Sequence, residues 1–118
     1  MRYLLLIYEN EKAWMSIPEE QQGAIFGEYM AFTESIKKSG NLLGGDPLQP
    51  TDTATCVRVR EGKRLVTDGP FAETREQLGG YYQIQANDLD EALAIAARIP
   101  SAVRELAVIE VRPIPEMG

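Results

Sequence analysis

Two carboxylates, Asp68 and Glu73, stand in one polar loop that follows a short strand-like segment. If the fold holds them close together and partly out of water, the pKa of one rises and the two form an acid/base pair. The same oxygen atoms suit a divalent cation, although two carboxylates alone are a weak indication of a metal site. Asp68 and Glu73 are therefore the candidate catalytic residues, and no metal site is predicted.

The same loop also has a purely structural interpretation. Asp68 can accept a hydrogen bond from the backbone that follows it, Gly69 supplies a positive φ, and Pro70 sets the next φ. Phe71 would then pin the loop to the core. For Asp68 this structural role is preferred over a direct chemical one.

Tyr81 and Arg58 complete the candidate ligand-binding set of Asp68, Glu73, Tyr81 and Arg58. Tyr81 alternates with the core-facing residues of its strand, so its hydroxyl either lines a cleft or packs in a dimer interface. Arg58 suits a carboxylate or phosphate ligand. A solvated arginine, or one paired with Glu61 or Glu73, is the plainer interpretation.

Composition narrows the possible chemistry. The 118 residues suit a single domain over 1–118, and they include no histidine and one cysteine, Cys56. Without histidine there is no Ser-His-Asp or Cys-His mechanism and no histidine metal site. Cys56 falls in a strand-like run and is interpreted as a small strand side chain. Any catalysis must use carboxylates, tyrosines, arginines, lysines or backbone amides.

Charge and glycine spacing exclude further classes. The net charge is -6 and the basic residues are scattered, which argues against a nucleic-acid partner. The glycines lack phosphate-loop and dinucleotide spacings, so no cofactor is predicted. No secretory signal and no run of apolar residues long enough to span a membrane is visible. A cytoplasmic protein without a membrane partner is the default expectation.

The elements that would position these residues follow from hydrophobic periodicity. Residues 1–8 form a predicted strand that is apolar on both faces, and residues 9–15 a loop. Ser16 and Glu19 have capping-box spacing, so a helix is predicted from there to about Ser39. The residues of its core-facing stripe are Ile25, Tyr29, Phe32 and Ile36.

The rest of the chain alternates strands, turns and one more helix. The predicted elements are an extended segment 41–50 broken by Gly44-Gly45, strands 53–60 and 63–67 around a Glu61-Gly62 turn, strand 80–86, a helix from Asp88 to Pro100 with Leu89, Ala92, Leu93 and Ala96 inward, and strand 106–112. This order predicts an α+β fold, the ferredoxin-like split βαβ arrangement, with a hairpin inserted between two βαβ halves and both helices on one face.

The first strand also predicts assembly. If Tyr3 and Leu5 face the helices, then Leu4, Leu6 and Tyr8 face the open side of the sheet. An exposed apolar sheet face indicates an interaction surface, and a twofold homodimer with its sheets packed face to face would cover it.

Several segments together resemble one known family. The run Asp68-Gly69-Pro70-Phe71-Ala72-Glu73, followed by Glu76-Gln77-Leu78-Gly79-Gly80-Tyr81-Tyr82, is similar to the signature of the YCII-related proteins in their DGPF subgroup. The resemblance covers nearly the whole chain, including Arg2-Tyr3-Leu4-Leu5-Leu6-Ile7-Tyr8, Leu43-Gly44-Gly45, Leu48-Gln49-Pro50 and Asp88-Leu89-Asp90-Glu91-Ala92.

The resemblance implies a ferredoxin-like dimer that forms an α+β barrel, with an uncharacterised biochemical role. Some members carry a His-Asp pair in a cleft, and this chain has no histidine to form one. Two functions stay open. The first is a dimeric small-molecule-binding or enzyme-like protein with its cleft at the dimer barrel. The alternative is a non-enzymatic accessory or regulatory module that acts by protein contact, since some DGPF relatives are associated with extracytoplasmic-function sigma factors.

Overall fold

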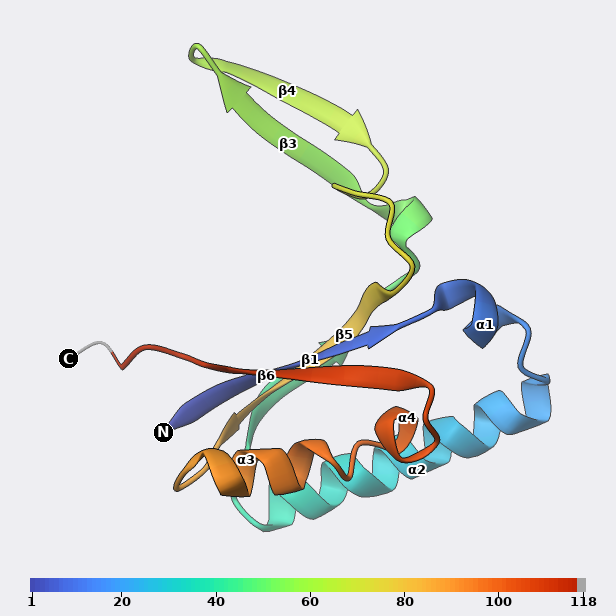
Figure 1. Cartoon of the computed structure of the whole chain (residues 1–118), viewed down its shortest axis with the longest axis vertical. Coiled ribbons are helices and arrows are strands. Elements are labelled where there is room, and N and C mark those ends of the chain that lie inside the picture. Colours follow the sequence, from blue (N-terminus) through green and yellow to red (C-terminus); the bar gives the residue numbers. More distant parts are fainter. Residues whose placement is uncertain (117–118) are drawn as a thin grey trace.

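A computed structural model describes residues 1–116 as an α+β fold with an antiparallel four-stranded sheet. The strand order is β2-β5-β1-β6, formed by β1 (Arg2–Glu9), β2 (Leu42–Pro47), β5 (Gln77–Gln85) and β6 (Ala107–Pro113). Three helices lie on one face of this sheet (Figure 1): α2 (Glu19–Lys38), α3 (Leu89–Ala96) and α4 (Pro100–Val103). The sheet and these helices are here called the body, and they confirm the predicted antiparallel sheet with its helices on one face.

The core lies between the sheet and α2. Strand β1 alternates as expected, with Tyr3 and Leu5 buried toward the helices and Leu4 only half-buried on the other face. The predicted stripe of α2 is confirmed because Ile25, Phe32 and Ile36 are buried and Tyr29 is half-buried. Phe32 meets the ring of Tyr82 edge-on, with ring centroids 5.4 Å apart. A single apolar stripe per element therefore suffices to build this core.

The segment before α2 differs from the prediction. Residues expected to form a loop include the short helix α1 (Glu11–Met15), and Asn10 Oδ1 caps it by accepting a hydrogen bond of 3.0 Å from Ala13 N. Ser16 ends this helix and donates its hydroxyl hydrogen to Ala13 O at 2.7 Å. The predicted capping box is therefore wrong, because Ser16 already serves α1. Pro18 precedes the first residue of α2 without a side-chain cap.

The helix predicted from Asp88 to Pro100 is partly confirmed as α3. Asp88 Oδ1 accepts a hydrogen bond of 2.9 Å from Glu91 N, which confirms the N-cap. The inward residues are Ala92, Ile95 and Ala96, while Leu89 and Leu93 are about half exposed, contrary to the expected stripe. Pro100 does not simply close this helix, because it begins α4, where its missing N–H leaves no intrahelical bond unmade.

A β-hairpin extends from the body between β2 and β5 (Figure 1). It consists of β3 (Thr55–Arg60) and β4 (Lys63–Asp68), and residues 55–68 are here called the arm. Its turn is confirmed, since Glu61 and Gly62 have φ of 51° and 76°, the sign that a tight two-residue hairpin turn requires. The short helix η1 (Thr51–Thr53) precedes it, so β3 begins later than predicted.

The signature loop that follows the arm does not reach the core. Phe71 is 81% exposed, so its predicted role as an anchor in the core of its own chain is wrong. The ring instead lies beneath the guanidinium of Arg58, with Cζ 5.7 Å from the ring centroid. Local turn chemistry was readable from the sequence, but the position of the loop outside the body was not.

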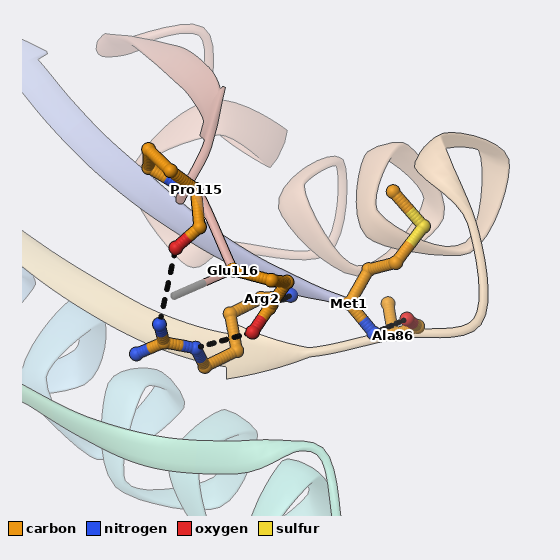
Figure 2. A network of polar contacts seen from close by, with 5 residues as sticks. All are labelled: Met1, Arg2, Ala86, Pro115 and Glu116. Atoms are coloured by element: carbon orange, nitrogen blue, oxygen red, sulfur yellow. Dashed lines mark hydrogen bonds and ion pairs between the residues drawn. The ribbon is translucent and has the colours of Figure 1, made fainter. Parts of the chain in front are cut away.

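The end of the sheet where the inner strand β1 begins is held by contacts among segments distant in sequence (Figure 2). The Met1 amino group donates to Ala86 O at 3.0 Å, and Arg2 Nη2 donates to Pro115 O at 3.4 Å. Arg2 Nε also pairs with Glu116 Oε2 at 3.5 Å.

Among the described residues, no helix has the length and apolar character needed to cross a membrane.

Candidate functional site

A cavity of about 480 Å³ opens between α2 and the helix-covered face of the sheet, beside α1. Its apolar and aromatic lining is Ile7, Trp14, Ile25, Phe26, Tyr29, Met30, Pro47, Tyr81 and Tyr82. Its polar and glycine lining is Glu9, Thr33, Glu34, Gly45, Asp46, Gly79 and Gly80. A concave, mainly apolar site with few polar groups is the usual form of a small-molecule site.

Two glycine pairs shape the sheet wall of this cavity. Register shifts occur in β2 between Leu42 and Gly44 and in β5 at Gly79, so a β-bulge lies just before the first glycine pair and within the second. A Cβ at Gly45 would come within 2.5 Å of Tyr81 O, and one at Gly80 within 3.2 Å of Asp46 O. Only glycine allows β2 and β5 to approach this closely. The predicted break at Gly44-Gly45 is not found, because β2 continues through both glycines, and the register shift lies just before them, between Leu42 and Gly44.

Glu9 is the charged group that faces the cavity from the sheet. Strand alternation places it on the same face as Ile7, and it is half-buried. Within residues 1–116 its carboxylate has no hydrogen-bond or ion-pair partner, and it passes directly over Gly79, where a Cβ would lie 2.5 Å from Oε1. Burial, and secondarily the charge of Glu11, raises the pKa of Glu9. A carboxyl group of this kind suits proton transfer or an ion pair with a ligand.

Two tyrosine hydroxyls are already paired beside the cavity. Tyr29 Oη donates to the buried Ser101 Oγ at 2.7 Å, and Tyr82 Oη shares a 2.7 Å hydrogen bond with Thr33 Oγ1. Burial raises the pKa of Tyr29 to about 12 and also raises the pKa of Tyr82. Both phenols therefore stay protonated at neutral pH, and they fix the wall of the cavity rather than exchange protons.

Asp46 and Tyr81 belong to the lining where β2 and β5 run side by side, but Tyr81 is the cross-strand partner of Leu6, so the side chains of this pair lie on the open face of the sheet. Tyr81 Oη donates to Asp46 Oδ2 at 3.1 Å, and this hydrogen bond is the main cause that raises the pKa of Tyr81. Glu34 on α2 is a third carboxylate in the lining, whereas the lining holds no lysine or arginine. Among the described residues, no group of three or more acidic or cysteine side chains has an arrangement that could hold a metal ion.

The structure separates the four predicted site residues. Tyr81 belongs to the cavity lining. Arg58 and Asp68 lie on the arm and Glu73 in the loop after it, and all three are exposed and absent from the cavity lining. Gly69 N donates to Ala54 O at 2.7 Å, which closes the base of the arm through the backbone. The signature run therefore divides, with its first half beside the arm and its Gly79-Gly80-Tyr81 half at the cavity.

Glu9 and Trp14 are cavity residues that no sequence motif indicated. Glu9 ends a strand whose alternate residues are Tyr3, Leu5 and Ile7, so its place in an inward-facing series was a usable signal. Trp14 lies in a segment that was predicted to form a loop. Asp46 directly follows the Gly44-Gly45 pair, which was predicted to break the extended segment 41–50, and a β-bulge lies just before that pair.

Comparison with known proteins identifies the family of this chain and gives no activity for it. The YCII-related domain matches residues 1–118, and the chain therefore belongs to the YCII-related domain family. An uncharacterized protein of Rhizobium meliloti (strain 1021) is 35% identical over 114 residues, which cover 97% of this chain and 92% of that protein. The resemblance seen in the sequence is thus confirmed at the level of the family, a domain of unknown function.

Proposed function

We propose that the protein binds a small, mainly apolar molecule in the cavity beside α2, with Glu9 as the residue that contacts its polar group. The observation that supports this most directly is a half-buried carboxylate without a protein partner among the described residues, facing a mainly apolar space. An unpaired polar group in such a place is costly unless water or a ligand satisfies it.

The lining indicates the chemistry of the ligand. Trp14, Phe26 and Tyr29 supply aromatic surface, and the charged residues of the lining are all acidic. A cation gains from both, through the ring faces and through Glu9, while an anion meets only repulsion. The site therefore fits a neutral or positively charged ligand, such as an amine with an apolar body.

An enzyme-like role follows from the same carboxyl group. The raised pKa of Glu9 makes it a better proton acceptor and donor near neutral pH than an ordinary glutamate. Because the phenols of Tyr29 and Tyr82 hold their protons, Glu9 is the group in the cavity that would move one.

The proposal includes assembly. In a homodimer of ferredoxin-like subunits, the open sheet faces would meet and form an α+β barrel, and a cleft at that barrel would be a second site, on the opposite face of the sheet from the cavity beside α2. The half-buried apolar residues Leu4 and Leu6 on the open face support this. Asp68, Glu73 and Arg58 stay predicted ligand-binding residues, in a site that a second copy would complete, because all three are exposed in one chain.

Trp14 allows a direct test, since it is the chain's single tryptophan and lines the cavity. Benzylammonium, benzyl alcohol and benzoate, which differ mainly in charge, are titrated against its fluorescence. We expect benzylammonium to bind most tightly and benzoate least. Glu9→Gln should remove the preference for the cation, whereas Glu20→Gln, outside the cavity, should leave it unchanged. No response to any of the three, or an unchanged preference in Glu9→Gln, would count against the proposal.

A second function has one specific observation in its favour. The arm presents Val57, Val59 and Val66 to solvent, a surface suited to contact with another protein. An accessory or regulatory module, linked to extracytoplasmic-function sigma factors, would use such a surface. Co-purification of such a sigma factor with the wild-type chain, and its loss on substituting these valines, would favour this function over the cavity.

A further inference from the structure

The apolar lining of the cavity beside α2 continues from its buried side out to solvent. Ile7 and Ile25 are 5% and 1% exposed, whereas Phe26 and Met30 in the same lining are 64% and 62% exposed. Lining residues that are this exposed stand where the cavity meets solvent. Phe26 and Met30 therefore form the α2 side of its opening, and this pair is here called the mouth.

The two residues of the mouth form one surface. Phe26 and Met30 are four positions apart on α2, a spacing that places two side chains next to each other on a helix. Single exposed apolar residues are common on protein surfaces, but an adjacent pair that continues a concave apolar lining indicates contact with a ligand. The mouth thus extends the binding surface beyond the buried part of the cavity.

The cavity is larger than a single aromatic ring requires. Its volume of about 480 Å³ is roughly three times the ~150 Å³ of an apolar cavity that holds one benzene molecule. A ligand of that size would leave most of the lining without contacts, and the dispersion energy of those contacts would be lost. A ligand that contacts the whole lining therefore has a longer apolar body than one ring.

Glu9 determines where the polar end of such a ligand lies. Its half-buried carboxylate passes over Gly79 on the sheet wall. Tyr29, which lines the same side, is half-buried and donates its hydroxyl to Oγ of Ser101, a residue that is 1% exposed. A cation paired with Glu9 therefore lies on the inner side of the cavity, and its apolar part has to extend toward the mouth.

A second carboxylate near the mouth has a different environment. Glu34 follows Met30 by one turn of α2 and belongs to the lining, but it is exposed. Water already solvates an exposed carboxylate, so an ion pair with a ligand adds little there. Glu9, which is half-buried, gains more from a cation. One positive charge at the inner end is thus favoured over a charge at each end.

We infer that the ligand is a primary amine with an unbranched alkyl chain, whose ammonium group pairs with Glu9 and whose chain extends to Phe26 and Met30. This ligand class rests on the function proposed above, binding in the cavity beside α2, and specifies the shape and charge of the bound molecule. Such an amine satisfies the half-buried carboxylate and covers the exposed apolar mouth in a single binding event.

A series of amines of increasing length tests the ligand class. Butylamine, hexylamine and octylamine carry the same ammonium group at pH 7, and 1,8-diaminooctane adds a second one at the far end of the chain. Each is titrated into the full chain and followed by the fluorescence of Trp14 and, independently, by calorimetry. Benzylammonium is titrated in parallel, because its binding tests the proposed function without depending on chain length.

We expect the dissociation constant to fall by about fourfold for each methylene group that leaves water, until the chain has passed the mouth. Octylamine should therefore bind more tightly than hexylamine, and more tightly than 1,8-diaminooctane, whose second charge would have to lie against the apolar mouth.

A double substitution tests the mouth itself. In Phe26→Gln with Met30→Gln, the gain in affinity from hexylamine to octylamine should disappear. The matched control is Leu89→Gln with Leu93→Gln, a pair with the same spacing on α3 that is 48% and 46% exposed and lies outside the lining, and it should keep the wild-type gain. Because the gain is a ratio between two amines, each variant is its own reference, and circular dichroism verifies its fold.

Three results would overturn this ligand class while benzylammonium still binds and the proposed function stands. Equal affinity for butylamine and octylamine would mean that the chain does not reach the mouth. An undiminished gain in the Phe26→Gln and Met30→Gln variant would mean that the chain leaves the cavity elsewhere. A diamine that binds at least as tightly as octylamine would place a second cation at Glu34. Absence of binding by benzylammonium and by every alkylamine would instead refute the proposed function, and the ligand class with it.

Discussion

The body and the arm are both antiparallel β-structure, and they bury their side chains in opposite ways. In β5 alternate residues such as Tyr82 and Ile84 are buried against the helices, whereas in β3 and β4 neither face is covered. Both regions are rich in residues that favour strands. The difference arises because α2 and α3 return over the body, and no helix of the described chain returns over the arm.

This difference indicates that the body supplies most of the stability of the fold and that the arm is the region available for contact with another molecule. The body has a closed core and is expected to fold as one unit, while the arm contributes little until another surface covers it. The cavity belongs to the body, at the point where two bulges interrupt otherwise regular strands. Substitutions placed in parallel in the two regions therefore test the comparison directly.

The largest contrast should come from apolar truncation. Ile84→Ala in the fully buried core is expected to lower the free energy of unfolding by about 2–5 kcal/mol, because it leaves a cavity. Val66→Ala in the exposed arm should change it by less than about 0.5 kcal/mol at protein concentrations low enough to keep the chain monomeric. Urea unfolding followed by tryptophan fluorescence measures both, and similar losses would show that the arm is covered by its own chain.

Glycine substitution should give the next largest contrast. A Cβ at Gly45 would lie 2.5 Å from Tyr81 O, so Gly45→Ala must push β2 away from β5 and should cost about 3 kcal/mol. Gly69, beside the arm, has φ of 98° and nothing within 4 Å of the added atom. Gly69→Ala should therefore cost only the backbone strain, about 1–2 kcal/mol. Thermal melts of the two variants compare them, and a reversed order would refute the close-approach argument.

Removal of one hydroxyl tests the wall of the cavity. Tyr29→Phe leaves the buried Ser101 Oγ without its partner and should cost about 1–3 kcal/mol. Tyr8→Phe is the control, because the Tyr8 hydroxyl makes no hydrogen bond within residues 1–116, and its cost should be near zero.

Alkaline unfolding gives the same hydroxyl a second signature. The pKa of Tyr29 is raised from 10.0 to about 12 in the folded chain, so the unfolded chain loses this proton first. The stabilisation is complete below pH 10 and is lost as the pH rises toward 12. The stability difference between the wild type and Tyr29→Phe should therefore shrink over this interval, and a constant difference would contradict the burial of this phenol.

The smallest expected effect is that of Glu9 on stability. Its pKa is raised above 4.5, so its protonated form is favoured in the folded chain. The contribution of Glu9 to the free energy of unfolding is most favourable below pH 4.5 and becomes unfavourable as the pH rises through the raised pKa. Glu9→Gln should therefore be more stable than the wild type at neutral pH, and this gain should vanish in acid. A gain that does not depend on pH would contradict the proposed burial of the charge.

Predictions from local chemistry were the ones that the structure confirmed. The stripe of α2, the Asp88 cap and the Glu61-Gly62 turn each depend on residues only a few positions apart. The Ser16 capping box was wrong because two helices competed for one serine. Local patterns are reliable where a single interpretation satisfies them, and less so where neighbouring elements share a residue.

The site was harder to predict because its parts are distant in the chain. Glu9, Tyr29 and Gly45 meet only after β1, α2 and β2 have packed. The signature run drew attention to Asp68 and Glu73, yet its contribution to the cavity is the later Gly79-Gly80-Tyr81 segment. Charge density in a loop does not reveal which surface that loop faces.

The sequence by itself determined the order of the strands and of α2 and α3, the buried side of β1 and of α2, the absence of histidine chemistry and the family. These depend on residue types and on short-range periodicity. Tertiary structure alone decided that Glu9 faces a cavity, that Phe71 and Arg58 stand outside the core, and that the arm is left uncovered. The reason is physical: solvent exposure and pKa shifts depend on which distant segments pack together, and no local pattern encodes that choice.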